Sequence, residues 1–273
     1  MKRFGLIGHP IDHSLSPALF KAAYGEHYEY KLIECAVFEE AYRRFLNEYD
    51  AINVTAPFKE SACAKADILN PECEILGACN VLKKTDKGIM AANTDYLGVM
   101  KSLLPYQTTR GLKPLTLVVG CGGAGKAAAY AACELGNEVI IINRTFSKAA
   151  AFADRLSENN SLYRICAREF SEFRKWFRKA GTIIYTLPCP VIELERLTKS
   201  DIKGRVFGYA EKLILEAAYK EPSFSSCMQK NMSAVNPKIT FVDGKQWLLH
   251  QAAEAYSIFT EEDPNIPEML KVL

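Results

Sequence analysis

The sequence predicts an α/β protein built from two domains, each a sheet covered by helices. Short apolar runs alternate with helical segments through the first hundred residues. A polar, turn-rich segment at residues 108–114 then interrupts this alternation. A continuous apolar run at residues 115–119, typical of a strand buried in a parallel sheet, begins a second alternating region. The 273 residues are enough for two modest hydrophobic cores.

The elements of the first region are predicted from apolar runs bounded by turn residues. Residues 4–7 form a short apolar run that ends at Gly8-His-Pro10, which indicates a buried strand. Ser16 followed by Pro17 matches an N-cap with proline at the first helical position, so a helix is predicted from Ala18. The same criteria predict strands at 28–35 and 51–55, helices at 39–49, after Lys59 and at 96–104, and a hairpin formed by 79–83 and 88–92.

The second region begins with the strand at 115–119 and a glycine cluster, Gly120-Cys-Gly-Gly-Ala-Gly125, followed by a helix through Glu134. We expect domain limits of 1–106 and 107–240, with a C-terminal helical part at 241–273. The remaining predicted elements are strands at 139–142, 182–187 and 212–215, a helical segment at 244–259, and a short helix bounded by Pro264 and Pro267.

Composition and charge argue against several classes of protein. The hydrophobic fraction of 49% and the charged fraction of 24% are ordinary for a soluble globular enzyme. A net charge of +2 and a pI near 8.0 give no basic stripe, so nucleic acid is not an expected ligand. No apolar run approaches the length of a membrane span, and the run at residues 4–7 is too short for a signal peptide. We therefore expect a cytoplasmic protein without membrane contact.

Cysteine and histidine usage supports the same expectation. The nine cysteines include no CxxC pair, and an odd number cannot all pair in disulfides. Reduced thiols in a cytosolic protein, mostly small buried hydrophobes, are therefore expected. The four histidines show no metal-ligand spacing, so no metal site is expected.

The glycine cluster indicates a dinucleotide site of the Rossmann type. Gly120, Gly122 and Gly125 fit G-x-G-x-x-G between a predicted strand and a predicted helix, which is the context this pattern requires. Glycines let the backbone approach a pyrophosphate, and the helix N-terminus offers unpaired N–H groups. A tight strand–helix turn without a ligand is the alternative interpretation.

The end of the next strand indicates which dinucleotide binds. An acidic residue there would accept hydrogen bonds from the ribose 2′-hydroxyl of NAD. This chain has Asn143-Arg144-Thr145 instead, with Lys148 close behind. The planar guanidinium of Arg144 suits a phosphate, so NADP is predicted over NAD, although an arginine here could also be a solvated surface residue.

Polar side chains gather near the ends of the first-domain strands. Asn53 and Thr55 lie two apart, so they face the same side of the strand at 51–55. They precede Lys59, and Asp95 follows the predicted hairpin. A lysine and a carboxylate near a hydride carrier are what alcohol–ketone interconversion needs, because oxygen exchanges a proton as carbon exchanges a hydride. Turn capping by the Asn and Thr, a solvated lysine and a helix N-cap at Asp95 are the structural alternatives.

Taken together, the motifs resemble the shikimate dehydrogenase family, nearly from end to end and in the family's order. The matching runs are Ile11-Asp-His-Ser14-Leu-Ser16-Pro17, Asn53-Val-Thr-Ala-Pro-Phe-Lys59, Gly77-Ala-Cys-Asn80, Asn93-Thr-Asp95, Gly120-Cys-Gly-Gly-Ala124, Asn143-Arg-Thr145 and Gly244 through Gln251-Ala-Ala253.

The resemblance implies a reversible, NADPH-dependent reduction of 3-dehydroshikimate to shikimate, with Lys59 as catalytic acid/base paired with Asp95. Residues 1–106 would bind the substrate, 107–240 would bind NADP, and the C-terminal helices would return to the substrate domain. The implied substrate residues are Ser14 and Ser16 for the carboxylate, Thr55, Asn80, Asp95 and Gln251 for ring hydroxyls, Asn53 in support, and Tyr219 near the cofactor. The implied cofactor residues are Gly120, Gly122, Gly123, Ala124, Gly125, Asn143, Arg144, Thr145 and Gly244.

The chain departs from the family pattern near the nicotinamide ribose. The family usually carries Asn-Ala-Thr-Pro and then Gly-Met, whereas this chain reads Tyr185-Thr-Leu-Pro188-Cys-Pro-Val191. Thr182 replaces an aspartate before that strand, and the methionine often found after Gly244 is absent, with Trp247 in that region. We interpret the chain as a divergent branch with retained activity.

Two alternatives stay open. One is a quinate/shikimate dehydrogenase that prefers NAD, against which Arg144 argues. The other is a non-catalytic homologue that binds shikimate and nucleotide without turnover, which only the departure at 185–191 supports. The chain is expected to act on a small molecule as a monomer or homodimer.

Overall fold

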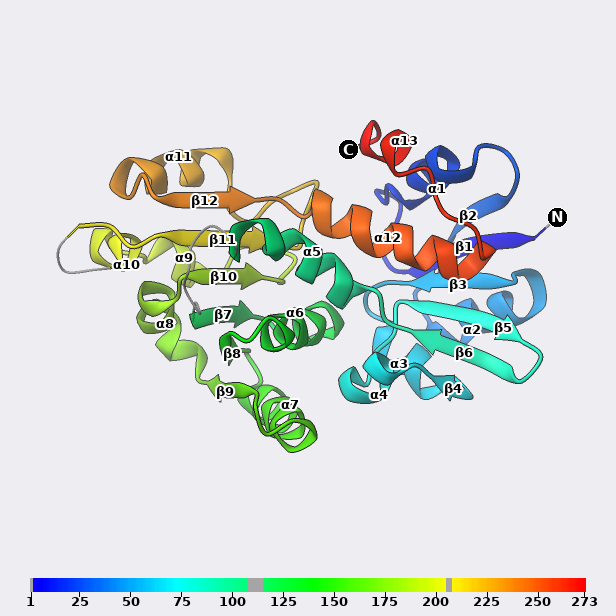
Figure 1. Cartoon of the computed structure of the whole chain (residues 1–273), viewed down its shortest axis with the longest axis horizontal. Coiled ribbons are helices and arrows are strands. Elements are labelled where there is room, and N and C mark those ends of the chain that lie inside the picture. The colour runs from blue at the N-terminus through cyan, green and yellow to red at the C-terminus, as the bar shows by residue number, and fades with distance from the viewer. Residues whose placement is uncertain (1, 108–114, 205–207) are drawn as a thin grey trace. The chain divides into compact units, whose positions relative to one another are not determined.

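The computed structural model describes residues 2–107, 115–204 and 208–273 (Figure 1). The predicted linker at 108–114 lies outside the described residues. The chain divides into two compact units, Met1–Gly98 with Leu248–Leu273, and Val99–Trp247. Both limits fall within helices that carry the chain from one unit to the other, α5 (Asp95–Gln107) and α12 (Lys245–Thr260). They differ from the predicted limits because a continuous helix contains no turn signal.

The first unit is built on a six-stranded sheet in the order β2-β1-β3-β5-β6-β4. Strands β1, β2 and β3 are parallel, β5 is antiparallel to β3 and to β6, and β4 is parallel to β6. The hairpin predicted at 79–92 is therefore confirmed. The elements are β1 (Arg3–Gly8), α1 (Ser16–Tyr24), β2 (Glu29–Glu34), α2 (Phe38–Glu48), β3 (Ala51–Val54), α3 (Lys59–Ala64), β4 (Ile68–Leu69), α4 (Pro71–Leu76), β5 (Val81–Thr85), β6 (Gly88–Ala92) and α13 (Ile266–Leu270).

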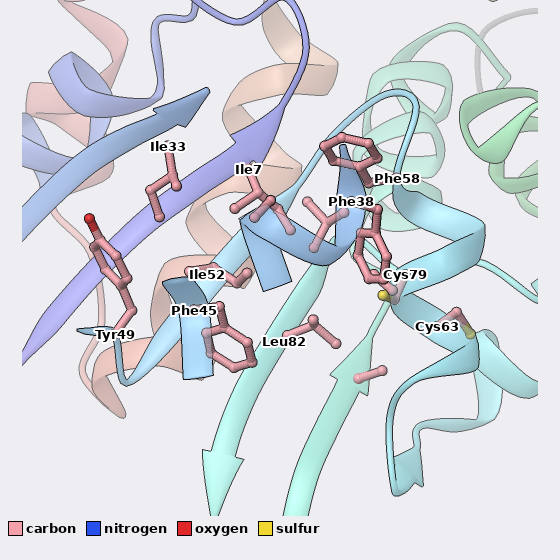
Figure 2. Packing of buried hydrophobic residues seen from close by; sticks show 14 of the residues in the cluster. Ile7, Ile33, Phe38, Phe45, Tyr49, Ile52, Phe58, Cys63, Cys79 and Leu82 are labelled. Atoms are coloured by element: carbon pink, nitrogen blue, oxygen red, sulfur yellow. The ribbon is translucent and has the colours of Figure 1, made fainter. Parts of the chain in front are cut away.

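One hydrophobic cluster of this unit supports the turn that carries Lys59. Figure 2 shows side chains of β1, β2, β3, β5 and α2 meeting in this cluster. Phe58, directly before Lys59, is 5% exposed, and its ring centroid lies 5.6 Å from that of Phe38. Apolar burial of a phenylalanine contributes about 2 kcal/mol, so Phe58 fixes the start of α3.

The start of α1 differs from the prediction by a small shift. The helix begins at Ser16 with Leu15 as its N-cap, so the N-cap predicted at Ser16 is wrong and Pro17 stands at the second helical position. The Ser14 hydroxyl accepts a hydrogen bond from the Ser16 N–H (3.2 Å). The Ser14 side chain thus pairs the N–H of the first helical residue, one of the N–H groups that have no partner within the helix.

The second unit has the strand order of a Rossmann fold. All six of its strands are parallel, in the order β12-β11-β10-β7-β8-β9. The predicted α/β class, with a Rossmann-type domain, is confirmed. The elements are β7 (Leu115–Val119), α6 (Gly123–Glu134), β8 (Glu138–Ile142), α7 (Phe146–Asn159), β9 (Arg164–Arg168), the 3-10 turn Phe170–Glu172, α8 (Phe173–Lys179), β10 (Thr182–Tyr185), α9 (Ile192–Glu195), α10 (Lys199–Lys203), β11 (Lys212–Glu216), α11 (Ser226–Val235) and β12 (Ile239–Val242).

Lysine 212 is a fully buried cation at the start of β11. Its Nζ donates to the carbonyl oxygens of Phe177 (2.7 Å), Arg178 (3.1 Å) and Ala180 (2.8 Å), at the end of α8. These are carbonyl groups that a helix C-terminus leaves without intrahelical partners. Burial lowers the pKa of Lys212 to about 8.

We expect the stability of the protein to depend on pH through Lys212. An unfolded lysine has a pKa of about 10.4, so between pH 8 and that value the unfolded chain binds more protons than the folded one. The free energy of unfolding should therefore rise with pH in this window, by up to about 1.4 kcal/mol per pH unit, relative to Lys212→Met. Urea unfolding at several pH values checks this. Lys238→Met, at an exposed lysine, is the control and should show the wild-type dependence of the free energy of unfolding on pH. A difference in the free energy of unfolding between wild type and Lys212→Met that stays constant with pH contradicts the prediction.

Within residues 2–107, 115–204 and 208–273, no helix has both the length and the apolar composition needed to cross a bilayer. The same residues contain no group of His, Cys, Asp or Glu side chains that could hold a metal ion. All nine cysteines carry free thiols, and six of them are buried.

Candidate active site

The topology of the first sheet brings several loops to one edge. Strands β1, β3 and β6 run in the same direction, so all three end at the same edge, and the antiparallel β5 begins there. Ser14 follows β1, Lys59 follows β3, Asn80 precedes β5 and Asp95 follows β6. Residues from four separate motifs are thereby placed at the carboxyl edge, where ligands bind in open α/β sheets.

Lys59 and Asp95 form an ion pair at this edge. The distance from Lys59 Nζ to Asp95 Oδ2 is 2.5 Å, and the side chains are only 15% and 7% exposed. Asn93 Oδ1 accepts the Asp95 backbone N–H (3.0 Å), and Asp95 is the first residue of α5 and not the N-cap residue before it. The alternative of a solvated Lys59 is likewise wrong, because the ammonium is paired and largely buried.

Three polar side chains form a buried network beside β5 and β6. The Thr94 N–H donates to Asn80 Oδ1 (2.8 Å), and Asn80 Nδ2 donates to Thr94 Oγ1 (2.9 Å) and to Gln251 Oε1 (2.9 Å). The Thr94 hydroxyl donates to the backbone carbonyl of Gln251 (2.8 Å). Asn80 and Thr94 are each 2% exposed. The structure therefore joins Asn80 and Gln251, two predicted site residues that are distant in sequence.

Asn53 is buried beneath this network, and its side chain is not a turn cap. Its Oδ1 accepts the Tyr30 hydroxyl (2.9 Å), and its Nδ2 donates to the Asn80 carbonyl (3.2 Å). Thr55 lies just beyond the end of β3 and is partly exposed, as an open ligand-binding position requires.

The two serines near the start of α1 contact each other. The Ser14 hydroxyl donates to Ser16 Oγ (3.2 Å), and the Tyr256 hydroxyl donates to the Ser16 carbonyl (3.0 Å). Two hydroxyl groups at the positive end of a helix suit a carboxylate. This is the chemistry that the resemblance implies for Ser14 and Ser16.

In the second unit, the predicted glycines form the turn between β7 and α6. Gly120 has φ +108°, and a Cβ there would lie 2.5 Å from Thr186 Oγ1. A Cβ at Gly125 would lie 2.2 Å from the Gly120 carbonyl oxygen, whereas one at Gly122 would meet nothing within 4 Å. Gly123 and Ala124, at the first helical positions, are partly exposed. The turn is tight where it meets the sheet and open at Gly122 before the helix N-terminus.

The other predicted cofactor residues of the second unit, and Tyr219, follow β8, β11 and β12. Asn143 Oδ1 accepts the Cys121 N–H (3.2 Å), while Arg144 and Thr145 are exposed. A Cβ at Gly244 would lie 2.3 Å from the Ala217 carbonyl oxygen, so close backbone packing requires that glycine. Tyr219 is partly buried in the segment after β11. Because Tyr219 belongs to the second unit, its role beside the first-unit residues stays a prediction.

The divergent stretch begins at a well-packed tyrosine at the end of β10, whereas residues 188–190 that follow are exposed. Tyr185 is fully buried, donates to the Cys189 carbonyl (2.8 Å) and contacts Phe224 edge-on, with ring centroids 5.5 Å apart. Burial raises the pKa of Tyr185 to about 12. Thr186 Oγ1 donates to the Val119 carbonyl (2.8 Å), directly before Gly120. Thr186, within the stretch that departs from the family pattern, thus attaches this segment to the start of the glycine turn.

Sequence reasoning missed Thr94 and Tyr30, which connect the predicted residues. Thr94 lies inside the quoted motif Asn93-Thr-Asp95, so a signal for it existed. Tyr30 carried no signal, because alternation placed it only as a strand residue.

Comparisons with known proteins agree with this architecture. Residues 6–82 match the family model described as shikimate dehydrogenase substrate binding domain. A protein named shikimate dehydrogenase (NADP(+)) from Haloarcula marismortui is 30% identical over 275 residues, which cover 98% of this chain and 97% of the relative.

Two solved structures share the fold over nearly the whole chain. Shikimate dehydrogenase of Mycobacterium tuberculosis is 27% identical with a TM-score of 0.78, and the match covers 100% of this chain and 98% of that one. Quinate dehydrogenase from Corynebacterium glutamicum in complex with NAD has a TM-score of 0.79 at 21% identity, covering 99% and 98%. At that identity the second likeness concerns the fold alone.

Proposed function

The chain belongs to the shikimate dehydrogenase family, and we propose that it catalyses the reversible NADPH-dependent reduction of 3-dehydroshikimate to shikimate. The observation that carries this proposal is the largely buried Lys59–Asp95 ion pair, at the same sheet edge as the Asn80–Gln251 amide pair. The amides and the two serines offer neutral donors and acceptors for a cyclic hydroxy acid. Residues 1–106 and the C-terminal helices would bind this substrate.

Lys59 is proposed as the acid/base. Its ammonium holds a proton at Nζ, which it gives to the ketone oxygen during reduction and takes back during oxidation. Asp95 accepts a hydrogen bond from Nζ and so orients the ammonium. Asn80, Gln251 and Thr55 would hold ring hydroxyls, and Ser14 and Ser16 the carboxylate.

The second unit fits NADP, which supplies the hydride when bound. The open position at Gly122, ahead of the α6 N-terminus, leaves room for a pyrophosphate to approach the backbone. Arg144 would hold the 2′-phosphate. The other cofactor contacts are proposed for Gly120, Gly123, Ala124, Gly125, Asn143, Thr145 and Gly244.

We further propose that the enzyme acts in the cytoplasm as a monomer or homodimer. The nine free thiols support a reducing compartment.

The proposed function is tested by following the absorbance of reduced nicotinamide with shikimate or quinate and with NADP or NAD. The highest kcat/KM is expected for shikimate with NADP. A preference for quinate and NAD would replace the proposal with the quinate dehydrogenase alternative. Binding of shikimate and NADP without turnover with either cofactor would favour a non-catalytic homologue.

Arg144→Ala should raise the KM for NADP by about tenfold or more and change the KM for NAD little. The reason is that a charge-assisted hydrogen bond to the 2′-phosphate contributes about 1.5–3 kcal/mol, and NAD lacks this group. Steady-state kinetics with both cofactors measure it, with Arg164→Ala, at an exposed arginine at the start of β9, as the control. Equal effects on both cofactors would contradict the assignment.

A further inference from the structure

We propose that Thr94 is a positioning residue that fixes which amide atoms of Asn80 and Gln251 are available to a substrate hydroxyl. The proposal rests on the proposed function, since it concerns the same site. Thr94 lies between β6 and α5, 2% exposed, and it bonds to both amide-bearing residues at distances of 2.8–2.9 Å.

The backbone of Thr94 determines the orientation of the Asn80 amide. A backbone N–H can only donate, so the Asn80 atom that it contacts at 2.8 Å must be the amide oxygen. The amide nitrogen of Asn80 is then on the other side, where it donates to Thr94 Oγ1 and Gln251 Oε1. Both hydrogens of this nitrogen are thereby used.

The hydroxyl of Thr94 imposes the same orientation independently. A backbone carbonyl can only accept, so the single Thr94 hydroxyl hydrogen is directed to the Gln251 carbonyl. The hydroxyl oxygen can then only accept from Asn80, which requires the amide nitrogen at that position. Two backbone groups, one donor and one acceptor, therefore fix the direction of every hydrogen bond in the network.

This direction decides what the amide pair can offer to a ligand. Gln251 Oε1 already accepts from Asn80, and Gln251 Nε2 donates one hydrogen to the Leu248 carbonyl (3.3 Å), so the second hydrogen of this nitrogen is its donor toward a hydroxyl. Asn80 Oδ1 keeps a second lone pair as an acceptor. A hydroxyl group, which donates one hydrogen bond and accepts others, satisfies both atoms, whereas a ring position without a hydroxyl would leave buried polar groups unpaired.

The test is a graded series at position 94. Thr94→Val keeps the shape but removes the hydroxyl, Thr94→Ser keeps the hydroxyl, and Thr94→Cys supplies a weak donor and acceptor. In Thr94→Val the backbone N–H still contacts Asn80 Oδ1, but one amide hydrogen of Asn80 and the Gln251 carbonyl lose the Thr94 hydroxyl. The KM for shikimate should therefore rise about tenfold or more in Thr94→Val, stay near wild type in Thr94→Ser, and be intermediate in Thr94→Cys. The KM for NADP should change less than about twofold in all three, as should kcat at saturating shikimate, because Lys59 and Asp95 are untouched.

Thr85→Val, at the opposite end of the β5–β6 hairpin, is the matched control and should leave the KM for shikimate unchanged.

Calorimetric titration of shikimate into each variant separates this proposal from the proposed function. Wild-type protein that does not bind shikimate overturns the proposed function and this inference with it. Wild-type protein that binds and turns over shikimate, while Thr94→Val binds it equally tightly, overturns only the role of Thr94. Equal losses in Thr94→Val and Thr94→Ser would also overturn it, since the hydroxyl would then not be responsible. If Thr94→Val does not fold, the ratio of shikimate affinities in Thr94→Ser and Thr94→Cys decides, and equal affinities refute the proposal.

Discussion

Lys59→Ala is expected to lower kcat by about 10²–10⁴-fold, with little change in the KM for NADP. The range is that of a positioned general acid, and Lys59 is the proposed proton donor to the ketone oxygen. Its side chain is 15% exposed and its Nζ lies 2.5 Å from Asp95. Because the position is largely buried, bulk water is a poor substitute for Lys59 as the proton donor. Removing the ammonium also leaves the Asp95 carboxylate buried without its partner, which costs about 3 kcal/mol of stability.

The control for this stability loss is the double variant Lys59→Met with Asp95→Asn, which removes both charges together. It should unfold closer to wild type than Lys59→Ala while remaining as inactive. Lys65→Ala removes an exposed lysine directly after the same helix, α3, and should leave kcat unchanged. Stopped assays of shikimate oxidation at saturating NADP measure kcat in each case. An unaltered kcat in Lys59→Ala would remove the acid/base role.

The position of Lys59 could be predicted because it depends on local signals. An apolar run ends at residue 54, Pro57 follows, and Phe58 provides the apolar anchor that the core confirms. The hairpin was predicted from its turn, and with it the reversal of β5 relative to β6. Without the resemblance, however, nothing in the residues indicated that β3 and β6 end at one edge. That depends on which strands pair.

The network around Thr94 could not be predicted, because its partners are far apart in the chain. Gln251 is separated from Thr94 by 157 positions, and α12 shows no pattern that identifies Gln251 as the residue directed to β6. The hydrogen bond of Tyr30 to Asn53 depends on the register of β2 beside β1, which alternation alone does not set. Similarly, β4 has only two residues, too few for any periodic signal.

The glycine turn was predicted from its sequence pattern, but the pattern does not show that its glycines meet different physical requirements. G-x-G-x-x-G treats Gly122 and Gly125 alike. In the structure, a methyl group at Gly125 would overlap the Gly120 carbonyl at 2.2 Å, whereas one at Gly122 would meet no protein atom within 4 Å. The two glycines should therefore respond differently to the same substitution.

Gly125→Ala should lower the free energy of unfolding by about 3 kcal/mol, because backbone must move to admit the methyl group. Gly122→Ala should leave stability nearly unchanged but weaken NADP binding by about tenfold or more, because the methyl group would occupy the approach of the pyrophosphate to the backbone. Urea unfolding and NADP titration of both variants measure the two effects, and each variant is the control for the other. Equal stabilities would contradict the packing role of Gly125. Unchanged NADP affinity in Gly122→Ala would mean that the open position at this turn serves no ligand, and the cofactor assignment of the second unit would then lose its main physical support.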